Sequence, residues 1–467
     1  MSKTNVLHHR TVLAISLAIA LGATGQSHSR TITAGPNKRL SANTETLVPT
    51  SVRSVSKCSD DGLPGTLRYE ISHANSGDTI DLSALPCGSI TLSNQWVPSQ
   101  IDIQQNELNV QGPSDHVLVI DGNRTSRVFR HWGSGTLELD GLIITNGFTT
   151  DDVWPRGGCV NSEGNLKFHN SIVTGCEVSS ATTQSYGGGV SAQGALYLYD
   201  SQITSSKAQS AIWALGGGAF VKGSLMMQRS LIDSNEVTPS MSGSKGGGLM
   251  VMGTIHALDS TISRNKAEVV GGIYLWGYGG IESGDLTNST ISNNVATIEN
   301  GGVWTTTPLV IMNSTIAFNR AQYADSSMAA GIYVENVPAE MTISSSIISN
   351  NVDAEGQLSD LGGVGTTTLA AGSSNSLITS SNFTLPADTI VACARLQPLA
   401  NNGGNVLTHL PESNSPAVDA GKDNGLTLDE RGAPRTANAS TDIGAVERQA
   451  LDSSEELLAD GFDGNCS

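Results

Sequence analysis

The chain has 467 residues, of which 15% are charged and 52 are glycine, and its formal net charge is -18. A chain of this length can bury a large core, and so much glycine favours a fold with many turns over one built from long helices. The negative charge argues against nucleic acid or an anionic membrane as a partner. We therefore expect a partner of another kind.

Residues 1–25 have the pattern of a secretory signal peptide. Lys3 and Arg10 precede an apolar run from Thr11 to Ala23, which is too short to span a bilayer, and small residues follow it. Residues 26–57 are rich in Ser and Thr, and this composition predicts a flexible leader. We expect a secreted or cell-surface protein with no transmembrane segment in the mature chain.

Six cysteines, an even number, indicate disulfides in a chain that is predicted to be exported. We expect Cys58 to pair with Cys87 and Cys393 to pair with Cys466, because each pair brackets one segment of the chain. Cys159 and Cys176 also lie near one another in the sequence. No CxxC pair occurs, so we expect no zinc and no cofactor. Calcium is compatible with the acidic composition, but no specific motif supports it.

A short amphipathic helix is predicted near Gly65, ahead of the first strands. Leu67, Ile71 and Ala74 fall at helical spacing. The residues that follow alternate in the manner of strands and are separated by turn residues. A stack of strands needs a cap over its first layer, because an open end exposes core and strand edges. We expect this helix to be that cap.

A short phrase recurs from about residue 135 to residue 352 with a period near 30 residues. Its clearest copies are Asp200–Thr204, Asp259–Ser263, Asn288–Ser292 and Asn313–Ala317, and a glycine cluster precedes each one. A fixed period of this length indicates a stacked repeat architecture. Apolar residues alternate within each repeat, which is the periodicity of a strand. Each repeat is therefore predicted to be one coil of short strands in a solenoid.

The position that closes each copy of the phrase is asparagine in most repeats. Stacked coils place these side chains about 4.8 Å apart, so that the amides can hydrogen-bond in a ladder along the axis. Asparagine also tolerates the left-handed backbone of a sharp corner. Both accounts are structural, and we expect this role for Asn235, Asn265, Asn294, Asn319 and Asn351.

A second column lies two residues after each glycine cluster. The residue before it is always small or aliphatic, so alternation along the strand predicts that the second column points outward. Earlier coils carry Val160 and Ser191 there. Either the column is an open face that binds sugar rings or a partner protein, or a loop or the C-terminal segment covers it as a second small core. Its members are Phe220, Met250, Tyr274, Trp304 and Tyr333.

Three segments resemble parts of bacterial β-helix proteins. Cys58 through Ile80 resembles the CSLREA-type start of these proteins, although an insertion follows Ser59 and Arg68–Ile71 departs from the name motif. The glycine clusters, with a phrase that ends in asparagine, resemble the repeats of polymorphic outer-membrane proteins. Residues 381–447 resemble the choice-of-anchor Q domain through Asn402-Gly403-Gly404, Thr408-His409, Ser415-Pro416-Ala417, Asp419-Ala420-Gly421, Asp429, Arg431-Gly432, Arg435 and Asp442–Glu447.

These resemblances imply an all-β fold, a right-handed parallel β-helix (solenoid) over residues 58–380 with a short N-terminal capping helix. They also imply a bacterial protein outside the cell or on its outer surface, without a single common activity. Residues 448–467 form an acidic tail with no hydrophobic anchor. We expect a monomer.

Right-handed β-helices include pectin lyases and polysaccharide hydrolases, so an enzyme is the first alternative. The motif series of polygalacturonase-like hydrolases is absent apart from Asp-Asp pairs. The weak catalytic candidates are Asp151, Asp152 and Arg156, which share one loop. His409, Asp419 and Asp429 lie in the domain signature, and we expect them to satisfy buried backbone groups rather than to form a triad, because no serine elbow accompanies them.

We favour a noncatalytic, adhesin-like protein that binds a glycan or a cell-surface protein through the aromatic column. A polysaccharide lyase or hydrolase and a purely structural spacer are the alternatives. An open aromatic column would favour the binder, and acids clustered with a base on one outward face would favour the enzyme.

Overall fold

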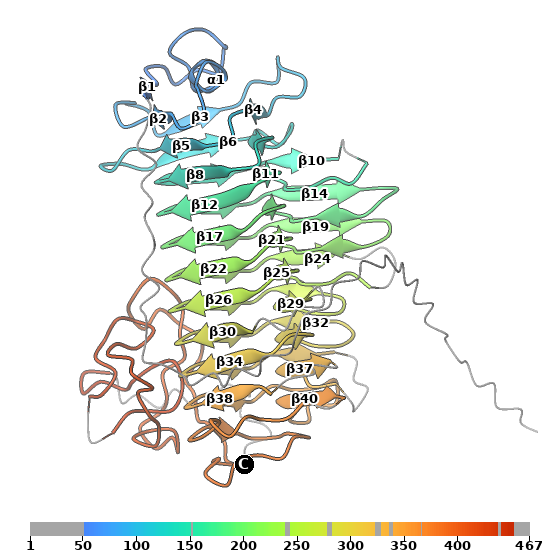
Figure 1. Cartoon of the computed structure of the whole chain (residues 1–467), viewed down its shortest axis with the longest axis vertical. Helices are drawn as coiled ribbons and strands as arrows, with labels where there is room; N and C mark the ends of the chain where they lie inside the picture. Colours follow the sequence, from blue (N-terminus) through green and yellow to red (C-terminus); the bar gives the residue numbers. More distant parts are fainter. Residues whose placement is uncertain are drawn as a thin grey trace, which may run out of the picture. The chain divides into compact units, whose positions relative to one another are not determined.

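The computed structural model describes residues 51–452, except for residues 151–152, 239–242, 278–282, 323–327, 336–339, 366 and 438–439. The described residues form a right-handed parallel β-helix, as predicted. Every strand pair in it is parallel, and the two longest sheets have 11 strands each. Figure 1 shows the coils stacked along one axis, with the N-terminal coils at the top.

One coil contributes one strand to each of four sheets, which we number I to IV in chain order. Sheet I consists of β4 (Ile101–Ile103), β7 (Phe129–His131), β11 (Val160–Ser162), β16 (Val190–Ala192), β21 (Ala219–Val221), β25 (Leu249–Val251), β29 (Ile273–Leu275), β33 (Val303–Thr305), β37 (Ile332–Glu335) and β40 (Leu361–Val364). Sheet II consists of β1 (Val52–Ser54), β2 (Thr79–Asp81), β5 (Leu108–Gln111), β8 (Thr136–Asp140), β12 (Asn165–His169), β17 (Leu196–Tyr199), β22 (Leu225–Gln228), β26 (Ile255–Leu258), β30 (Gly284–Thr287), β34 (Leu309–Met312) and β38 (Thr342–Ser344).

Sheets III and IV complete the coil. Sheet III consists of β3 (Ser89–Thr91), β6 (Leu118–Asp121), β9 (Leu142–Thr145), β13 (Ile172–Thr174), β18 (Gln202–Thr204), β23 (Leu231–Asp233), β27 (Thr261–Ser263), β31 (Thr290–Ser292), β35 (Thr315–Ala317), β39 (Ile347–Ser349) and β41 (Leu377–Ile378). Sheet IV consists of β10 (Phe148–Thr149), β14 (Glu177–Ser180), β19 (Lys207–Ser210), β24 (Glu236–Thr238), β28 (Lys266–Ala267), β32 (Val295–Ala296) and β36 (Arg320–Ala321).

A return segment leads from sheet IV back to sheet I of the next coil. In two coils it contains a short strand, β15 (Ser185–Tyr186) or β20 (Ala214–Leu215), and these two strands pair with each other. The glycine cluster ends the return segment with a tight reversal. Gly216 has a φ of +73°, and a Cβ there would collide with the carbonyl of Ala219. Only glycine fits such a turn without strain.

The core of the solenoid is one continuous cluster of inward-facing aliphatic side chains. The apolar residue of the repeated phrase stacks in register from coil to coil. Ile203 pairs with Ile232, which pairs with Ile262 on the next strand. All three are fully buried, and burial of a side chain of this size stabilises the fold by ~1.5–3 kcal/mol.

The asparagine column forms a continuous hydrogen-bonded ladder at the corner between sheets III and IV. The side-chain Nδ2 of Asn235 donates to Oδ1 of Asn265 at 3.0 Å, and Asn265 donates in the same way to Asn294 at 2.9 Å. The ladder continues through Asn319 to Asn351, whose Nδ2 donates to Asp360 Oδ1 at 2.8 Å. Each backbone N–H of the column also donates to the next side-chain oxygen.

The left-handed backbone at this corner lies one residue earlier than the sequence suggested. The residue before each ladder asparagine has a positive φ, and this residue is Arg264 or Phe318 in two of the coils. The corner therefore does not depend on asparagine for its backbone. The amides are held by the ladder, since a buried amide without a partner would cost ~1–3 kcal/mol.

The predicted cap is present as α1 (Leu67–Ser72), whose N-terminal residue Thr66 accepts a hydrogen bond from the Tyr69 N–H. Leu67 and Ile71 are buried against the first coils. The predicted disulfide between Cys58 and Cys87 joins this cap to the start of sheet III. Among the described residues, no helix is long and apolar enough to cross a membrane.

A second disulfide joins Cys159 and Cys176 within one coil, and both residues are buried. The sequence showed only that these two cysteines are close along the chain. The pairing expected for Cys393 involves Cys466, which lies outside the described residues. That pairing, the signal peptide, residues 26–50 of the leader and most of the acidic tail stay predictions. The last residues predicted as flexible leader belong to the fold, because β1 (Val52–Ser54) pairs with β2 in sheet II.

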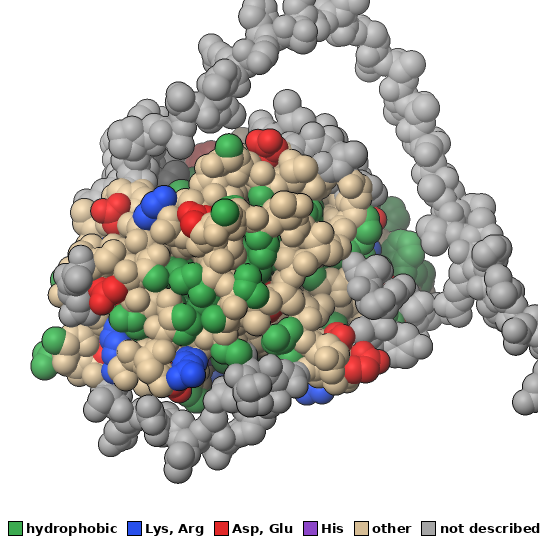
Figure 2. Space-filling view, turned by 90° about the horizontal axis from the view of Figure 1, so that it is seen from below, with side chains coloured by type: hydrophobic (Ala, Val, Ile, Leu, Met, Phe, Trp, Pro, Cys, Tyr) green, Lys and Arg blue, Asp and Glu red, His purple; other side chains and the backbone are tan. Residues whose placement is uncertain are grey.

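After β41 the described residues form no further helix or strand. Leu369, Phe383 and Leu385 are partly buried and pack against the last coils. Viewed from this end, hydrophobic side chains gather near the centre of a mostly polar surface (Figure 2). The following residues, 396–449, lie beside the lower coils in Figure 1 and have a cluster of buried residues that they share with the end of sheet III. We call residues 396–449 the C-terminal segment.

Candidate functional site

The outer face of sheet I carries two columns of side chains that point away from the solenoid core. The outer column follows directly after each strand, and its backbone N–H groups continue the parallel ladder between coils. It contains Trp132, Glu163, Gln193, Lys222, Met252 and Trp276. The inner column is the central position of each strand and contains Asp102, Arg130, Asn161, Ser191, Phe220, Met250, Tyr274, Trp304 and Tyr333.

The strand register corrects one assignment made from the sequence. Ser191 pairs with Asn161, whereas Val160 pairs with Val190 and faces the core. The early coils therefore hold Arg130, Asn161 and Ser191 at the position that becomes aromatic later. The inner column has a polar half in β7, β11 and β16 and an apolar half from β21 onward.

Of the two alternatives for the aromatic column, the structure shows the second, a covered small core, and the expectation that these five residues bind a ligand on an open face is wrong. The side chains of its five members are only 1% to 7% exposed. They form a second small core with Val269 and Val270, and Tyr186 and Leu215 of the return segments pack against it. Strand alternation predicts correctly that the column leaves the solenoid core, but it contains no information about the return segments that fold over the same face.

The rings in the apolar half also pack against one another. Tyr274 meets Trp304 edge-on at 5.7 Å between centroids, and Trp304 meets Tyr333 in the same manner at 5.1 Å. The polar atoms at their edges are satisfied, because Trp304 Nε1 donates to Glu335 and Lys245 Nζ donates to the Tyr274 hydroxyl. This arrangement is typical of a packed core rather than of a ligand-binding face.

Two residues of the polar half, Asn161 and Ser191, are also buried, but each has a polar atom without a partner among the described residues. Asn161 is 2% exposed and Ser191 is 0% exposed. Within the described part of the chain, neither the Asn161 Oδ1 nor the Ser191 Oγ has a hydrogen-bond partner, and the same is true of Gln193 Nε2 and Arg156 Nε. A buried polar group without a partner costs ~1–3 kcal/mol. Four such atoms lie on neighbouring coils of one face, and a polar ligand could supply the hydrogen bonds that they lack.

An exposed tryptophan lies at the N-terminal end of the outer column. The Arg130 guanidinium stacks on the Trp132 ring at 3.8 Å, and Trp132 Nε1 donates to Asp102 Oδ1 at 3.0 Å. These two contacts hold the ring in one orientation while 44% of the residue stays exposed. Trp276 is also 44% exposed and lies five coils further along the same column, a distance of about 24 Å at the spacing of stacked strands.

Of the three weak catalytic candidates, the structure describes Arg156 alone. Asp151 and Asp152 lie outside the described residues. Arg156 lies on the return segment that borders the polar half, where its guanidinium is 5.7 Å from the Tyr186 ring and its carbonyl accepts a hydrogen bond from Arg127 Nε. Within the described part of the chain, no three His, Cys, Asp or Glu side chains are grouped in a way that could hold a metal ion.

The residues considered as a triad have other contacts. His409 Nδ1 lies 2.7 Å from the Gln397 carbonyl, and His409 Nε2 lies 2.7 Å from Ser292 Oγ. The carboxylate of Asp429 accepts hydrogen bonds from the backbone N–H groups of Arg431 and Ala433. Both side chains bind buried backbone groups, in the manner that the sequence suggested.

Sequence reasoning missed Asn161, Gln193 and Trp132 as candidate site residues. A repeat alignment could have found them, because they occupy the same columns as aromatic residues two to five coils later. It could not have shown that polar atoms of Asn161 and Gln193 are buried without partners among the described residues, since this depends on the segments that fold over the same face.

No family model matches the chain, and no curated protein matches it. Among solved structures, the crystal structure of pectate lyase Pel9A is similar, with a TM-score of 0.48 and 13% sequence identity. The similarity covers 86% of this chain and 98% of the pectate lyase chain. At this identity it concerns the fold alone, and no residue role is taken from it.

Proposed function

We propose that this chain is a secreted or cell-surface, noncatalytic, adhesin-like β-helix protein of a bacterium. Its site is the polar half of the sheet I face, and its ligand is a glycan. Two disulfides within the solenoid and its cap are typical of proteins outside the reducing cytosol. They support export, which the predicted signal peptide would direct.

The observation that carries the proposal is the exposed Trp132 on the face of sheet I whose next two coils hold the buried atoms that lack partners among the described residues. A sugar ring has an apolar face and a rim of hydroxyls. The exposed face of Trp132 suits the ring face, and the accessible side chains of Glu163, Gln193 and Lys222 suit the hydroxyls. The unpartnered atoms of Asn161 and Ser191 are buried, so a hydroxyl reaches them only where binding displaces their cover. Because Arg130 and Asp102 already hold the tryptophan, binding would lose little side-chain entropy.

The straight columns favour a linear chain of repeated units over a compact ligand. Consecutive coils present the same strand position at a constant spacing of about 4.8 Å. Glu163, Gln193 and Lys222 lie between the two exposed tryptophans and provide polar groups along that line. An open apolar face, which a partner protein would favour, is not what the inner column offers.

The three resemblances belong to this proposal. The Cys58–Cys87 disulfide is compatible with a CSLREA-type start, and the glycine reversals with the asparagine ladder are compatible with repeats of the polymorphic outer-membrane-protein type. The C-terminal segment would be the choice-of-anchor Q domain. We propose these as the families to which the three regions are related.

A polysaccharide lyase or hydrolase is the second candidate, because Arg156 borders the same polar half. Incubation of the mature protein with a panel of polysaccharides distinguishes the two functions. Binding without new chain ends agrees with the noncatalytic proposal. Release of oligosaccharides that the Arg156→Ala variant no longer produces would replace it by the enzyme.

A glycan array with the mature protein tests the binding proposal. Stacking on an aromatic ring is worth ~1–3 kcal/mol by analogy with bases, so Trp132→Ala should weaken binding roughly 5- to 150-fold with an almost unchanged melting temperature. Trp213→Ala is the matched control, since Trp213 is 47% exposed but belongs to neither column. Unchanged binding by Trp132→Ala, or no bound glycan at all, would contradict the proposal.

A further inference from the structure

The C-terminal segment covers the outer face of sheet III, away from the site proposed above. Three threonines on successive coils, Thr261, Thr290 and Thr315, lie in register on this face and are buried. Thr315 Oγ1 accepts a hydrogen bond from the Ala445 N–H at 3.0 Å, and the Asn313 side chain donates to the Lys422 carbonyl at 2.7 Å. The interface is therefore rich in polar contacts between distant parts of the chain.

Glu430 brings a carboxyl group into the middle of this interface. It is 3% exposed. One oxygen lies 3.0 Å from Thr261 Oγ1 and the other lies 2.5 Å from Thr290 Oγ1. Among the described residues its side chain has no other hydrogen bond and no ion pair. A fully buried carboxylate with no cation and no N–H donor is strongly disfavoured.

The number of protons available for these hydrogen bonds shows whether Glu430 is ionised or protonated. Thr261 Oγ1 also lies 2.6 Å from the carbonyl oxygen of Leu407. A carbonyl oxygen can only accept, and a hydroxyl has one proton, so the Thr261 proton is used in the bond to Leu407. The contact between Thr261 and Glu430 therefore needs a proton from Glu430. Thr290 can still donate its own proton to the other oxygen of Glu430.

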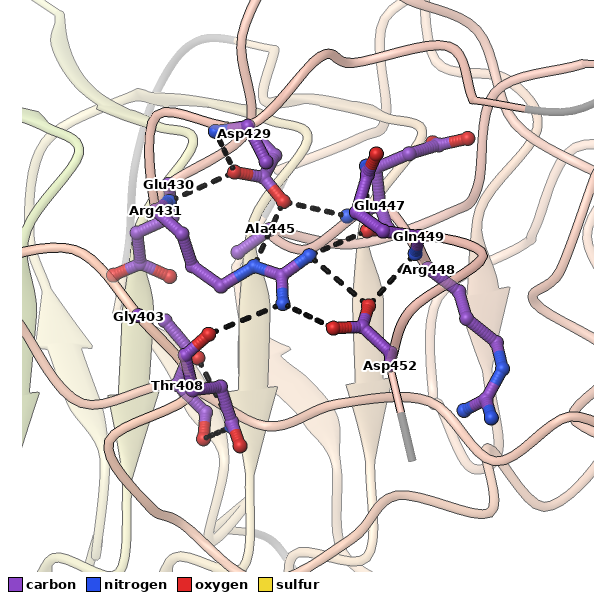
Figure 3. A network of polar contacts seen from close by, with 12 residues as sticks. Gly403, Thr408, Asp429, Glu430, Arg431, Ala445, Glu447, Arg448, Gln449 and Asp452 are labelled. Atoms are coloured by element: carbon purple, nitrogen blue, oxygen red, sulfur yellow. Dashed lines mark hydrogen bonds and ion pairs between the residues drawn. The ribbon is translucent and has the colours of Figure 1, made fainter. Parts of the chain in front are cut away.

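The preceding residue shows the opposite arrangement. The Asp429 carboxylate accepts two hydrogen bonds at each oxygen, from backbone N–H groups of Arg431, Ala433 and Glu447 and from Arg431 Nε, at 2.9 to 3.2 Å (Figure 3). Four N–H donors stabilise the ionised form. Two carboxyl groups adjacent in sequence thus meet donors of different kinds, four N–H groups for Asp429 and hydroxyls alone for Glu430.

The charged groups that face Glu430 do not neutralise it. Asp259, at the end of β26, and Asp429 both add negative charge, while the buried Arg435 adds one positive charge and donates to the carbonyls of Ala445 and Gly444. Burial, followed by the charges of Asp259 and Asp429, raises the pKa of Glu430 well above its ordinary value, although the two threonine hydroxyls lower it in part.

We infer that Glu430 is a protonated carboxylic acid when the C-terminal segment is docked, so that docking on sheet III takes up a proton and weakens at alkaline pH. The proton completes a chain of hydrogen bonds from Glu430 through Thr261 to the carbonyl of Leu407. Loss of this proton would leave a buried charge at the interface and bring two lone pairs together at the Thr261 contact.

His409 has the opposite dependence on pH in the same interface. Its Nδ1 must donate to the Gln397 carbonyl, so its Nε2 accepts from Ser292 in the neutral form. Burial lowers the pKa of His409 to about 4. Its contribution to docking is therefore complete above the unperturbed pKa of about 6.5 and is lost as the pH falls toward 4.

Two other carboxyl groups near this interface have raised pKa values that lie at or below about 7. Burial raises the pKa of Asp259 to about 6 and that of Glu447 to about 7. The Glu430 contribution is complete below its ordinary pKa of 4.5 and is lost as the pH rises through its raised pKa. Between about pH 4.5 and 6.5 docking also releases a proton from the His409 imidazole, and this release offsets the proton that Glu430 takes up. Above about pH 7 Asp259 and Glu447 are ionised, and the coupling of docking to protons that the inference predicts there is that of Glu430.

Hydrogen exchange of residues 396–449 in the full mature chain tests the inference between pH 7 and 9. Uptake of one proton predicts that the opening constant, corrected for the intrinsic exchange rate, rises about tenfold per pH unit. Glu430→Gln supplies an N–H toward Thr261 and an oxygen toward Thr290, so its opening constant should not change with pH. The control Asp423→Asn removes an exposed carboxylate of the same segment and should keep the wild-type slope.

A wild-type opening constant that does not change with pH, or a Glu430→Gln variant that keeps the slope, would overturn the inference. Infrared spectroscopy provides a second readout that needs no variant. The wild-type protein at pH 7 should show a carboxylic acid C=O band that disappears on the alkaline side together with opening of the segment. Absence of this band at pH 7 would overturn the inference even if the variant fails to fold.

Discussion

The two halves of the inner column of sheet I share one backbone geometry and differ in chemistry. The early coils carry Asn161 and Ser191, and the later coils carry the rings of Tyr274 and Trp304 at the same strand position. Asn161 and Ser191 are as buried as the rings, and Tyr186 and Leu215 of the return segments pack against the later half. In the later half the return segments and the column residues form one apolar core. In the early half some buried polar atoms have no hydrogen-bond partner among the described residues. A repeat therefore determines where a side chain points, and the cover determines what the side chain can do.

The largest expected effect is in the apolar half. Trp304→Ala removes a buried ring that packs on two others, and truncations of this kind cost ~3–5 kcal/mol. Thermal or denaturant unfolding should show this loss, while Trp276→Ala, at an exposed position of the outer column, should change stability little. Equal melting of the Trp304 variant and the parent would mean that the cover does not hold in solution.

An intermediate loss of stability is expected in the asparagine ladder. This ladder lies at the corner between sheets III and IV, in the same coils as the apolar half of sheet I. Asn265→Ala removes an amide that accepts from Asn235 and donates to Asn294. The unpartnered groups that remain should cost ~1–3 kcal/mol. Lys266→Ala, at the next and exposed residue, is the control and should be close to neutral. If both variants unfold at the same denaturant concentration, the ladder contributes no stability of its own.

The smallest effect on stability is expected in the polar half, and it sharpens the comparison most. Ser191→Ala removes a hydroxyl that has no partner, so stability should stay within ~0.5 kcal/mol while glycan binding weakens. Ser230→Ala is the matched control, because Ser230 is equally buried but donates to the Gln228 carbonyl and accepts from the Ser201 N–H. It should cost ~1–3 kcal/mol. A reversed order of the two serines would remove the distinction between the halves.

Much of the scaffold could be predicted from local patterns. The spacing of Leu67 and Ile71 predicted the cap, and the period with its alternation predicted the stacked coils. The closing asparagines predicted an amide ladder because a constant period places them above one another. These patterns are reliable since neighbouring coils repeat one geometry and errors do not accumulate across long loops.

The candidate site could be predicted only in part. The direction of the column at Trp304 followed from alternation, but its exposure did not, because the return segments have neither the period nor the apolar pattern of the strands. The wrong assignment of Val160 to the column shows that a register shift of one residue exchanges the inward and outward faces. For the same reason Asn161 was missed.

By itself, the sequence determined the repeat, the orientation of strand side chains, the ladder and one disulfide pair, because each depends on residues that are adjacent or a fixed number of positions apart. Only the tertiary structure decided which outward faces are covered. The return segments cover sheet I, and the C-terminal segment covers sheet III with Glu430 between two threonines more than 100 positions away. Such contacts join segments without a common period, so they depend on packing in three dimensions and not on local pattern.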